Sequence, residues 1–255
     1  MDYIISAATD VGIAKDTNQD SFGVKTVETQ LGKMAIAIIC DGMGGLSKGE
    51  VASATVVDAF HKWILHKLPS LCETGITDNI IRNDWTEIIQ TCNRRISSYG
   101  KNIGINLGTT LAVIMLTETR YYIVNIGDSR VYEILNKVSL LTKDQTVVAK
   151  ELEAGILTEE QAKNDPRRSI LLQCIGASEV IEPDYFFGTP QKDAVYMLCS
   201  DGFRHEITED EIFQYLNPSV MYDARQMKQN MDTLIDINKQ RQEKDNISVV
   251  SIRTY

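Results

Sequence analysis

This chain of 255 residues contains few histidines, and its basic residues are fewer than its acidic residues. It has three histidines and a formal net charge of −9 at pH 7. The negative charge argues against non-specific binding to nucleic acid or to an anionic membrane surface. The apolar runs are too short to span a bilayer, and the N-terminal residues lack the pattern of a signal peptide. We therefore expect a cytoplasmic protein that binds neither nucleic acid nor membrane.

The sequence also lacks closely spaced cysteines and flexible linkers. The five cysteines include no Cys-x-x-Cys motif, which indicates buried thiols in a reducing compartment. No stretch is rich in Pro, Gly and Ser, and there is no repeat or low-complexity segment. With 43% hydrophobic and 24% charged residues, the composition is that of an ordinary globular protein. We predict one domain over residues 1–255 and a monomer.

Short runs rich in Val, Ile and Tyr predict seven β-strands. They cover residues 3–8, 34–40, 109–116, 121–126, 131–135, 194–199 and 247–252. Helical periodicity predicts three longer helices, at residues 50–68, 80–99 and 221–239. In the last helix, Met227, Met231, Leu234 and Ile235 form a stripe that we interpret as core packing. Because the strands cluster, we expect an α+β fold with antiparallel sheets and helices layered outside.

Five aspartates lie at the ends of apolar runs. Asp41, Asp128 and Asp201 come at or just after the end of such a run, whereas Asp20 and Asp245 begin one. In an antiparallel sheet the start of one strand lies beside the end of its neighbour, so the five carboxylates could converge on one edge of the core. Two carboxylates about 4 Å apart repel by roughly 4 kcal/mol at an effective dielectric of ~20, so their convergence requires a cation.

Hard divalent cations with oxygen ligands, Mg²⁺ or Mn²⁺, meet this requirement. Zinc is disfavoured because histidine is scarce, and His61 and His66 fall on the first predicted helix. The glycines that follow Asp41 free backbone carbonyls for ligation and let a bulky substrate approach. A single Asp-Gly pair is more often a plain turn. Two such pairs after buried strands, with three more aspartates at strand ends, favour a metal site.

Eight short motifs follow one another from residue 15 to residue 250. They are KDTNQDSFG (15–23), CDGMGG (40–45), GTTLAV (108–113), NIGDSRVY (125–132), LTKDQT (141–146), LLQCIGAS (171–178), CSDGF (199–203) and DNISVV (245–250). In this order they resemble the bacterial form of the metal-dependent protein Ser/Thr phosphatases of the PP2C (PPM) family. The resemblance implies a PP2C-like β-sandwich of two antiparallel sheets flanked by helices on both sides.

The resemblance also implies a metal-binding role for these aspartates. Asp41 would bridge two Mn²⁺ or Mg²⁺ ions, and Asp201 and Asp245 would complete the first site. The carbonyl of Gly42 would serve the second site, which Asp20 would reach through water. The two ions would share a water or hydroxide that attacks phosphorus in line, so no phosphoenzyme forms.

Three further positions are carried over in the same way. Asp128, together with Asp201, matches the family's weaker third metal position. Lys15 stands where family members usually have an arginine that grips the substrate phosphate. Lysine keeps the charge but loses the bidentate fork, and a solvent-exposed lysine is the other interpretation. His205 either ligates near the third metal or lines the cleft.

Residues 147–169 match the family's flap region, next to the active site. Within this flap, Arg167 and Arg168 could attract phosphopeptides, although an exposed basic pair is the commoner explanation. The leading hypothesis is hydrolysis of phosphoserine and phosphothreonine on proteins, whose phosphorylation would come from a Ser/Thr kinase. One alternative is a weakly active phosphoprotein-binding sensor of the same fold, motivated by Lys15. Another is a two-metal hydrolase of a different phosphoester.

Overall fold

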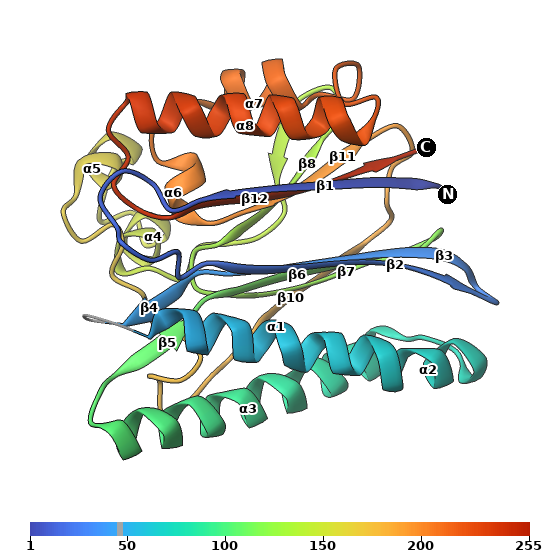
Figure 1. Cartoon of the computed structure of the whole chain (residues 1–255), viewed down its shortest axis with the longest axis horizontal. Helices are drawn as coiled ribbons and strands as arrows, with labels where there is room; N and C mark the ends of the chain where they lie inside the picture. The colour runs from blue at the N-terminus through green and yellow to red at the C-terminus, as the bar shows by residue number, and fades with distance from the viewer. Residues whose placement is uncertain (45–47) are drawn as a thin grey trace.

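The computed structural model describes residues 1–44 and 48–255. In this part of the chain, two five-stranded antiparallel sheets stack face to face, and helices cover both outer sides (Figure 1). The predicted α+β sandwich flanked by helices is therefore confirmed. No helix among these residues combines the length and the apolar character that a membrane crossing requires.

The two sheets each contain strands from both halves of the chain. The first sheet contains, in spatial order, β1 (Tyr3–Asp10), β12 (Ile247–Thr254), β11 (Val195–Cys199), β8 (Arg130–Ile134) and β9 (Val138–Leu140). The second contains β10 (Asp184–Gly188), β7 (Tyr121–Ile126), β6 (Leu111–Leu116), β3 (Gly32–Cys40) and β2 (Ser21–Thr29). A small third sheet pairs β4 (Gly42–Gly44) with β5 (Leu107–Thr109).

The helices form two outer layers and a cluster at one end (Figure 1). The second sheet is covered by α1 (Gly49–His66) and α3 (Asp78–Ile103), with α2 (Leu68–Thr74) between them in the chain. The first sheet is covered by α7 (Glu209–Leu216) and α8 (Ala224–Gln240). At one end of the sandwich lie α4 (Val147–Glu153), α5 (Glu159–Asn164) and α6 (Asp201–Arg204).

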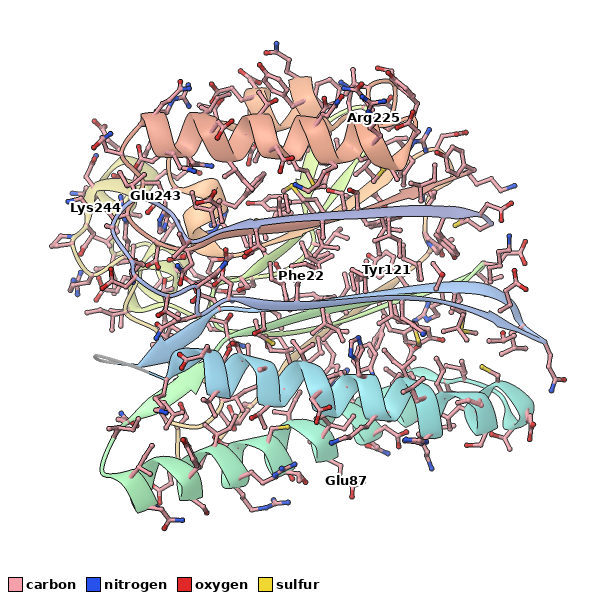
Figure 2. All side chains as sticks on the ribbon, viewed as in Figure 1. Phe22, Glu87, Tyr121, Arg225, Glu243 and Lys244 are labelled. Carbon is pink, nitrogen blue, oxygen red and sulfur yellow. The ribbon has the colours of Figure 1, made fainter. Side chains whose placement is uncertain are left out.

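Strand β3 explains why the longest apolar run of the sequence shows no alternation. Its even-numbered residues 34–40 pack with α1 and α3, and its odd-numbered residues 35–39 pack toward the first sheet. A strand that is buried on both faces needs apolar residues at every position. Phe22 and Tyr121 project into the space between the sheets (Figure 2) and pack against the same inter-sheet core.

All seven predicted strands are present, but the one predicted at 109–116 is divided. Thr109 ends β5 and Leu111 begins β6, because Thr109 pairs with Gly42 in the small third sheet. The sequence did not predict β2, β4, β9 and β10, nor the short helices. All five cysteines, which lie in the described residues, are buried free thiols as expected.

The three predicted helices correspond to α1, α3 and α8. The last one begins at Ala224 rather than at residue 221, because the Asp223 side chain caps it and accepts a hydrogen bond from the Gln226 N–H at 2.7 Å. Its methionine stripe is buried under the first sheet, which confirms the core-packing interpretation. The assignment of residues 1–255 to one domain stays a prediction.

Candidate active site

The five aspartates lie at the same end of the sandwich, and they come from both sheets. The antiparallel pairing of β2 with β3 makes Asp20 and Asp41 neighbours in the second sheet. The pairing of β11 with β12 brings Asp201 and Asp245 together at the end of the first. Asp128 lies in the turn that carries the chain from β7 to β8, and therefore from one sheet to the other. The site is thus assembled across the junction of the sheets.

A serine hydroxyl joins the two halves of this site. Ser200 Oγ donates to Oδ2 of Asp20 at 2.9 Å and accepts from the Ser248 N–H at 3.0 Å. The other oxygen of Asp20, Oδ1, is buried and has no hydrogen-bond partner among the described residues. Burial raises the pKa of Asp20 to about 7, and the charges of Asp201 and Asp245 add to this rise against the serine hydrogen bonds.

Asp41 is fixed through its backbone. Its N–H donates to Thr110 Oγ1 at 2.9 Å, and its carbonyl accepts from the Thr110 N–H and from Thr109 Oγ1, both at 2.9 Å. These bonds leave the Asp41 carboxylate oxygens unused. Burial raises the pKa of Asp41 well above its usual value, and the charges of the other four aspartates raise it further.

Gly42 is required by a close approach of the backbone. A Cβ atom here would lie 2.4 Å from the carbonyl oxygen of Gly49, at the start of α1, and 2.5 Å from that of Gln19. With its amide nitrogen turned toward Gly42, the Gln19 side chain donates to the Gly42 carbonyl and accepts from the Gly49 N–H, each at 3.2 Å. Gly45, the last glycine of the CDGMGG motif, lies outside the described residues.

Two basic side chains border the carboxylates. His205 Nε2 lies 3.4 Å from Asp201 Oδ2, and its Nδ1 lies 3.2 Å from Glu243 Oε2. Arg204 Nη2 lies 3.5 Å from Asp128 Oδ2 and donates to the Asp128 carbonyl at 3.1 Å. Burial raises the pKa of Asp128 to about 7, with a contribution from Asp201, although Arg204 opposes the rise. Both basic residues therefore contact proposed metal ligands directly.

Lys15 forms an ion pair with one of the five aspartates. Its Nζ lies 3.0 Å from Asp245 Oδ1, and 43% of the Lys15 side chain is exposed. Burial disfavours the ammonium, but the hydrogen bond and the charge of Asp245 outweigh it and raise the pKa of Lys15. Glu243 fixes the backbone here, since its Oε1 accepts from the Asp245 N–H at 2.8 Å. Lys15 thus lies at the site rather than in open solvent.

Asn246 connects the loop that carries Lys15 to β12. Its Oδ1 accepts from the Gln19 N–H at 2.9 Å, and its Nδ2 donates to the carbonyls of Val11 at 2.9 Å and Thr17 at 3.2 Å. Three bonds from one side chain therefore determine where the loop approaches Asp245.

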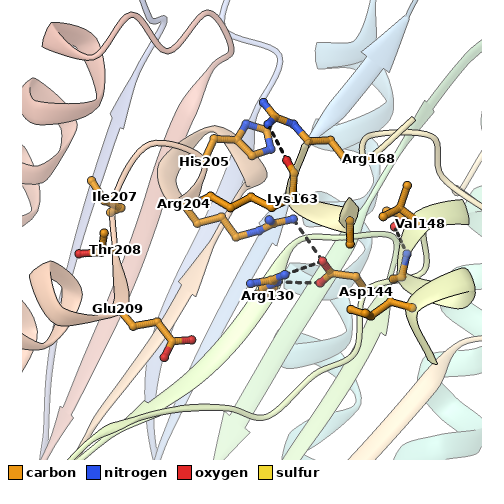
Figure 3. Close-up of a pocket in the computed structure, with 14 residues that line it drawn as sticks. Arg130, Asp144, Val148, Lys163, Arg168, Arg204, His205, Ile207, Thr208 and Glu209 are labelled. Atoms are coloured by element: carbon orange, nitrogen blue, oxygen red, sulfur yellow. Dashed lines mark hydrogen bonds and ion pairs between the residues drawn. The ribbon is translucent and has the colours of Figure 1, made fainter. Parts of the chain in front are cut away.

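The flap (residues 147–169) forms α4 and α5 and presents its two arginines differently. Arg167 is paired within the flap, with Glu151 Oε1 and Oε2 at 3.0 and 2.7 Å and with Asp165 Oδ2 at 2.8 Å. Arg168 lines a pocket together with Arg204 and His205 (Figure 3). Of the two arginines, Arg168 is the one that borders the site.

Sequence reasoning missed three residues that shape the site: Arg204, Glu243 and Asn246. Arg204 directly follows the CSDGF motif, and Asn246 lies within the DNISVV motif, so the position of each residue in the sequence was a usable signal. Glu243 was less visible, because its contact with His205 depends on the docking of the last strand beside α6 (Figure 2 shows Glu243 at this end of the molecule).

The residues present fit a divalent cation. Oδ1 of Asp20 and Oδ1 of Asp201 are buried without hydrogen-bond partners among the described residues, and the donors are hard carboxylate oxygens. The Lys15 ammonium on Asp245 marks a position where positive charge is favoured. No three His, Cys, Asp or Glu side chains within 1–44 and 48–255 form a ready-made ligand group. The carboxylates therefore lie in one charged region, but no three of them in the described part of the chain are close enough together to hold one ion as they stand.

Comparisons with known proteins agree with this architecture. The family model described as protein phosphatase 2C matches residues 13–236. A protein of Streptococcus pyogenes named putative protein phosphatase 2C-type is 31% identical over 252 residues, which cover 97% of this chain and 96% of that protein.

Solved structures show the same fold. The S. agalactiae serine/threonine phosphatase is 28% identical, with a TM-score of 0.82 and coverage of 99% of this chain and 100% of that one. The catalytic domain of the serine threonine protein phosphatase PstP, solved with 2 manganese ions, is 23% identical with a TM-score of 0.78, covering 98% and 97%.

The chain therefore belongs to the protein phosphatase 2C family. It is an enzyme of the protein phosphatase class, and its family is metal-dependent.

Proposed function

We propose that this enzyme hydrolyses phosphoserine and phosphothreonine on proteins with the help of two Mn²⁺ or Mg²⁺ ions. The observation that carries the proposal is the gathering of five carboxylates at one end of the sandwich, two of which have a buried oxygen without a partner among the described residues. The serine/threonine specificity and the manganese named for relatives of this fold agree with it.

In this proposal the aspartates divide between the two ions. Asp41 would contribute to holding both ions, Asp201 and Asp245 would hold the first, and the carbonyl of Gly42 would hold the second, with Asp20 acting through water. When bound, the ions supply an activated water for direct in-line attack on phosphorus and positive charge for the phosphoryl oxygens.

The other residues of the site position these groups and the substrate. Lys15 leaves Asp245 and contacts the substrate phosphate. Arg204 restrains Asp128, which serves a weaker third ion together with Asp201. The alternative of a weakly active phosphoprotein-binding sensor is not favoured, because every aspartate of the proposed metal site is present.

Turnover of a phosphothreonine peptide tests the proposal. Exhaustive treatment with EDTA should abolish activity, and Mn²⁺ or Mg²⁺ should restore it. Asp41→Asn should lose both activity and Mn²⁺ binding measured by calorimetry. Asp232→Asn, which makes the same change on α8, should retain both. Undiminished turnover after chelation, or full Mn²⁺ binding by Asp41→Asn, would exclude the two-metal site.

Three expectations from the sequence stay predictions. They are the cytoplasmic location, the monomeric state and a Ser/Thr kinase as the source of the phosphorylated substrates. Size-exclusion chromatography with light scattering tests the monomer directly.

A further inference from the structure

A pocket of about 480 Å³, shown in Figure 3, lies between two groups of helices. Helices α4 and α5 of the flap form one wall, and the end of α6 with the start of α7 forms the other. Arg204 and His205 belong to its lining, and the same two side chains contact Asp128 and Asp201. The pocket therefore begins one side chain away from the proposed metal ligands.

Positive charge predominates in this pocket, although the chain as a whole carries −9. Its lining includes four cationic side chains, Arg130, Lys163, Arg168 and Arg204, against the carboxylates of Asp144 and Glu209. Such a local excess attracts anionic groups and raises their concentration at the cleft.

Part of this charge is already compensated inside the protein. Arg130 forms a bidentate pair with Asp144 at 2.8 and 2.7 Å, which leaves little of either charge for a ligand. Arg204 Nη2 lies between Asp144, at 3.4 Å, and Asp128, at 3.5 Å. Its Nε is buried and has no partner among the described residues. One donor of the Arg204 guanidinium is therefore unsatisfied among the described residues.

The flap supplies the cations that are free to bind. Neither Lys163 nor Arg168 pairs with a carboxylate within residues 1–44 and 48–255, and the only hydrogen bond of the Arg168 side chain there is a 3.4 Å bond to the Lys163 carbonyl. Arg167, the next residue in the chain, is fully engaged by Glu151 and Asp165. The flap thus neutralises one arginine internally and leaves the adjacent one facing the pocket.

Apolar side chains complete the walls. Val148 and Leu152 of α4 and Ile207 before α7 line the same space. They can pack against the methylene groups of an acidic side chain while its carboxylate reaches the cations. A small inorganic anion would leave these apolar walls uncovered.

We propose that this pocket binds the carboxylate of a Glu or Asp that lies close in sequence to the phosphorylated residue of the substrate protein. The assignment rests on the proposed phosphatase function and adds a preference for acidic flanking sequence. Because the pocket borders the metal ligands, a residue within about three positions of the phosphoresidue can reach it at ~3.3–3.6 Å per residue.

A series of phosphothreonine peptides tests the assignment in the Mn²⁺-loaded enzyme. Each peptide carries Glu at one position from −3 to +3, and its partner carries Gln at that position. At one or two positions the Glu peptide should have a kcat/KM higher by about 3- to 10-fold, the range of one or two partly exposed ion pairs. Hydrolysis of the Gln peptides with Mn²⁺ reports independently on the proposed phosphatase function.

The variants Lys163→Gln and Arg168→Gln should each bring the Glu-to-Gln ratio of kcat/KM toward 1. Lys150→Gln is the matched control, because Lys150 is an exposed flap lysine outside the pocket lining. It should keep the native ratio. A general loss of activity cancels in this ratio, so a fold defect does not imitate the effect.

Three results would overturn the assignment. One is a Glu-to-Gln ratio near 1 at every position in the native enzyme, and another is an equal loss of preference in Lys150→Gln. The third is weaker inhibition by inorganic phosphate in Lys163→Gln without any Glu preference, which would assign the pocket to a free anion.

Discussion

Replacing Lys15 with alanine should change catalysis and metal binding in opposite directions. A charge-assisted contact with the substrate phosphate is worth roughly 1.5–3 kcal/mol. To make it, Lys15 has to leave Asp245, and an ion pair of this exposure is worth about 0.2–1 kcal/mol. The net contribution is therefore about 0.5–3 kcal/mol, so kcat/KM on a phosphothreonine peptide should fall by about 2- to 150-fold.

The same substitution removes a cation that competes for Asp245. Loss of an ion pair worth up to about 1 kcal/mol should tighten Mn²⁺ binding by up to about fivefold. Lys15→Arg keeps the charge and adds a planar fork, so its kcat/KM should match or exceed the native value. Steady-state kinetics and Mn²⁺ calorimetry on both variants measure the two effects.

Lys25→Ala provides the control, since Lys25 is an exposed lysine of β2. It should leave both measurements at their native values. If Lys15→Ala changes kcat/KM less than twofold, Lys15 does not contact the phosphate, and Arg168 becomes the next residue to examine. If Mn²⁺ affinity is unchanged, the ion pair with Asp245 does not compete with the metal.

Three further predictions follow from individual contacts. Asp128→Ala should lower turnover while two ions stay bound, as counted by calorimetry; loss of all metal would place Asp128 in the primary site. Asn246→Ala removes three hydrogen bonds and should cost about 2–4 kcal/mol in urea unfolding, and a loss below 0.5 kcal/mol would mean that the loop is fixed elsewhere. The Arg241 guanidinium lowers the pKa of Glu211 to about 2, so the pair stabilises the fold above about pH 4.5 and this stabilisation disappears as the pH falls toward 2. Arg241→Gln should therefore lower Tm, measured by circular dichroism, more at pH 6 than at pH 2.5, where only part of the stabilisation remains; a pH-independent difference would contradict this origin.

The sequence predicted the central strands because they are buried on both faces. Residues 34–40 are apolar at every position, so no tertiary knowledge was needed to recognise β3. The edge strand β2 was missed because its middle, Val24 to Thr26, is exposed and partly polar. The short helices α5 and α7 were missed although Thr158 with Gln161 and Thr208 with Glu211 form capping boxes. These capping signals are local and were available in the sequence.

The convergence of the aspartates was predictable because strand ends meet at sheet edges, which is a property of any antiparallel sheet. The contacts that modify the site were not predictable from the sequence. Lys15 and Asp245 are 230 positions apart in the chain, and their pairing depends on the loop that Asn246 fixes. Arg167 differs from Arg168 because the fold of the flap brings Arg167 onto Glu151, which lies on α4 of the same flap. Neither arrangement has a periodicity or a spacing that the sequence displays.

The carboxylates are divided between the two sheets, with Asp20 and Asp41 on one and Asp201 and Asp245 on the other. The separation between the two pairs is therefore set by the thickness of the inter-sheet core, where Ala35 and Ala37 are completely buried. Enlarging one of these alanines should alter metal affinity without replacing any ligand. In this fold, the core packing that determines stability would then also set the separation of the carboxylates that we propose as ligands of two cations.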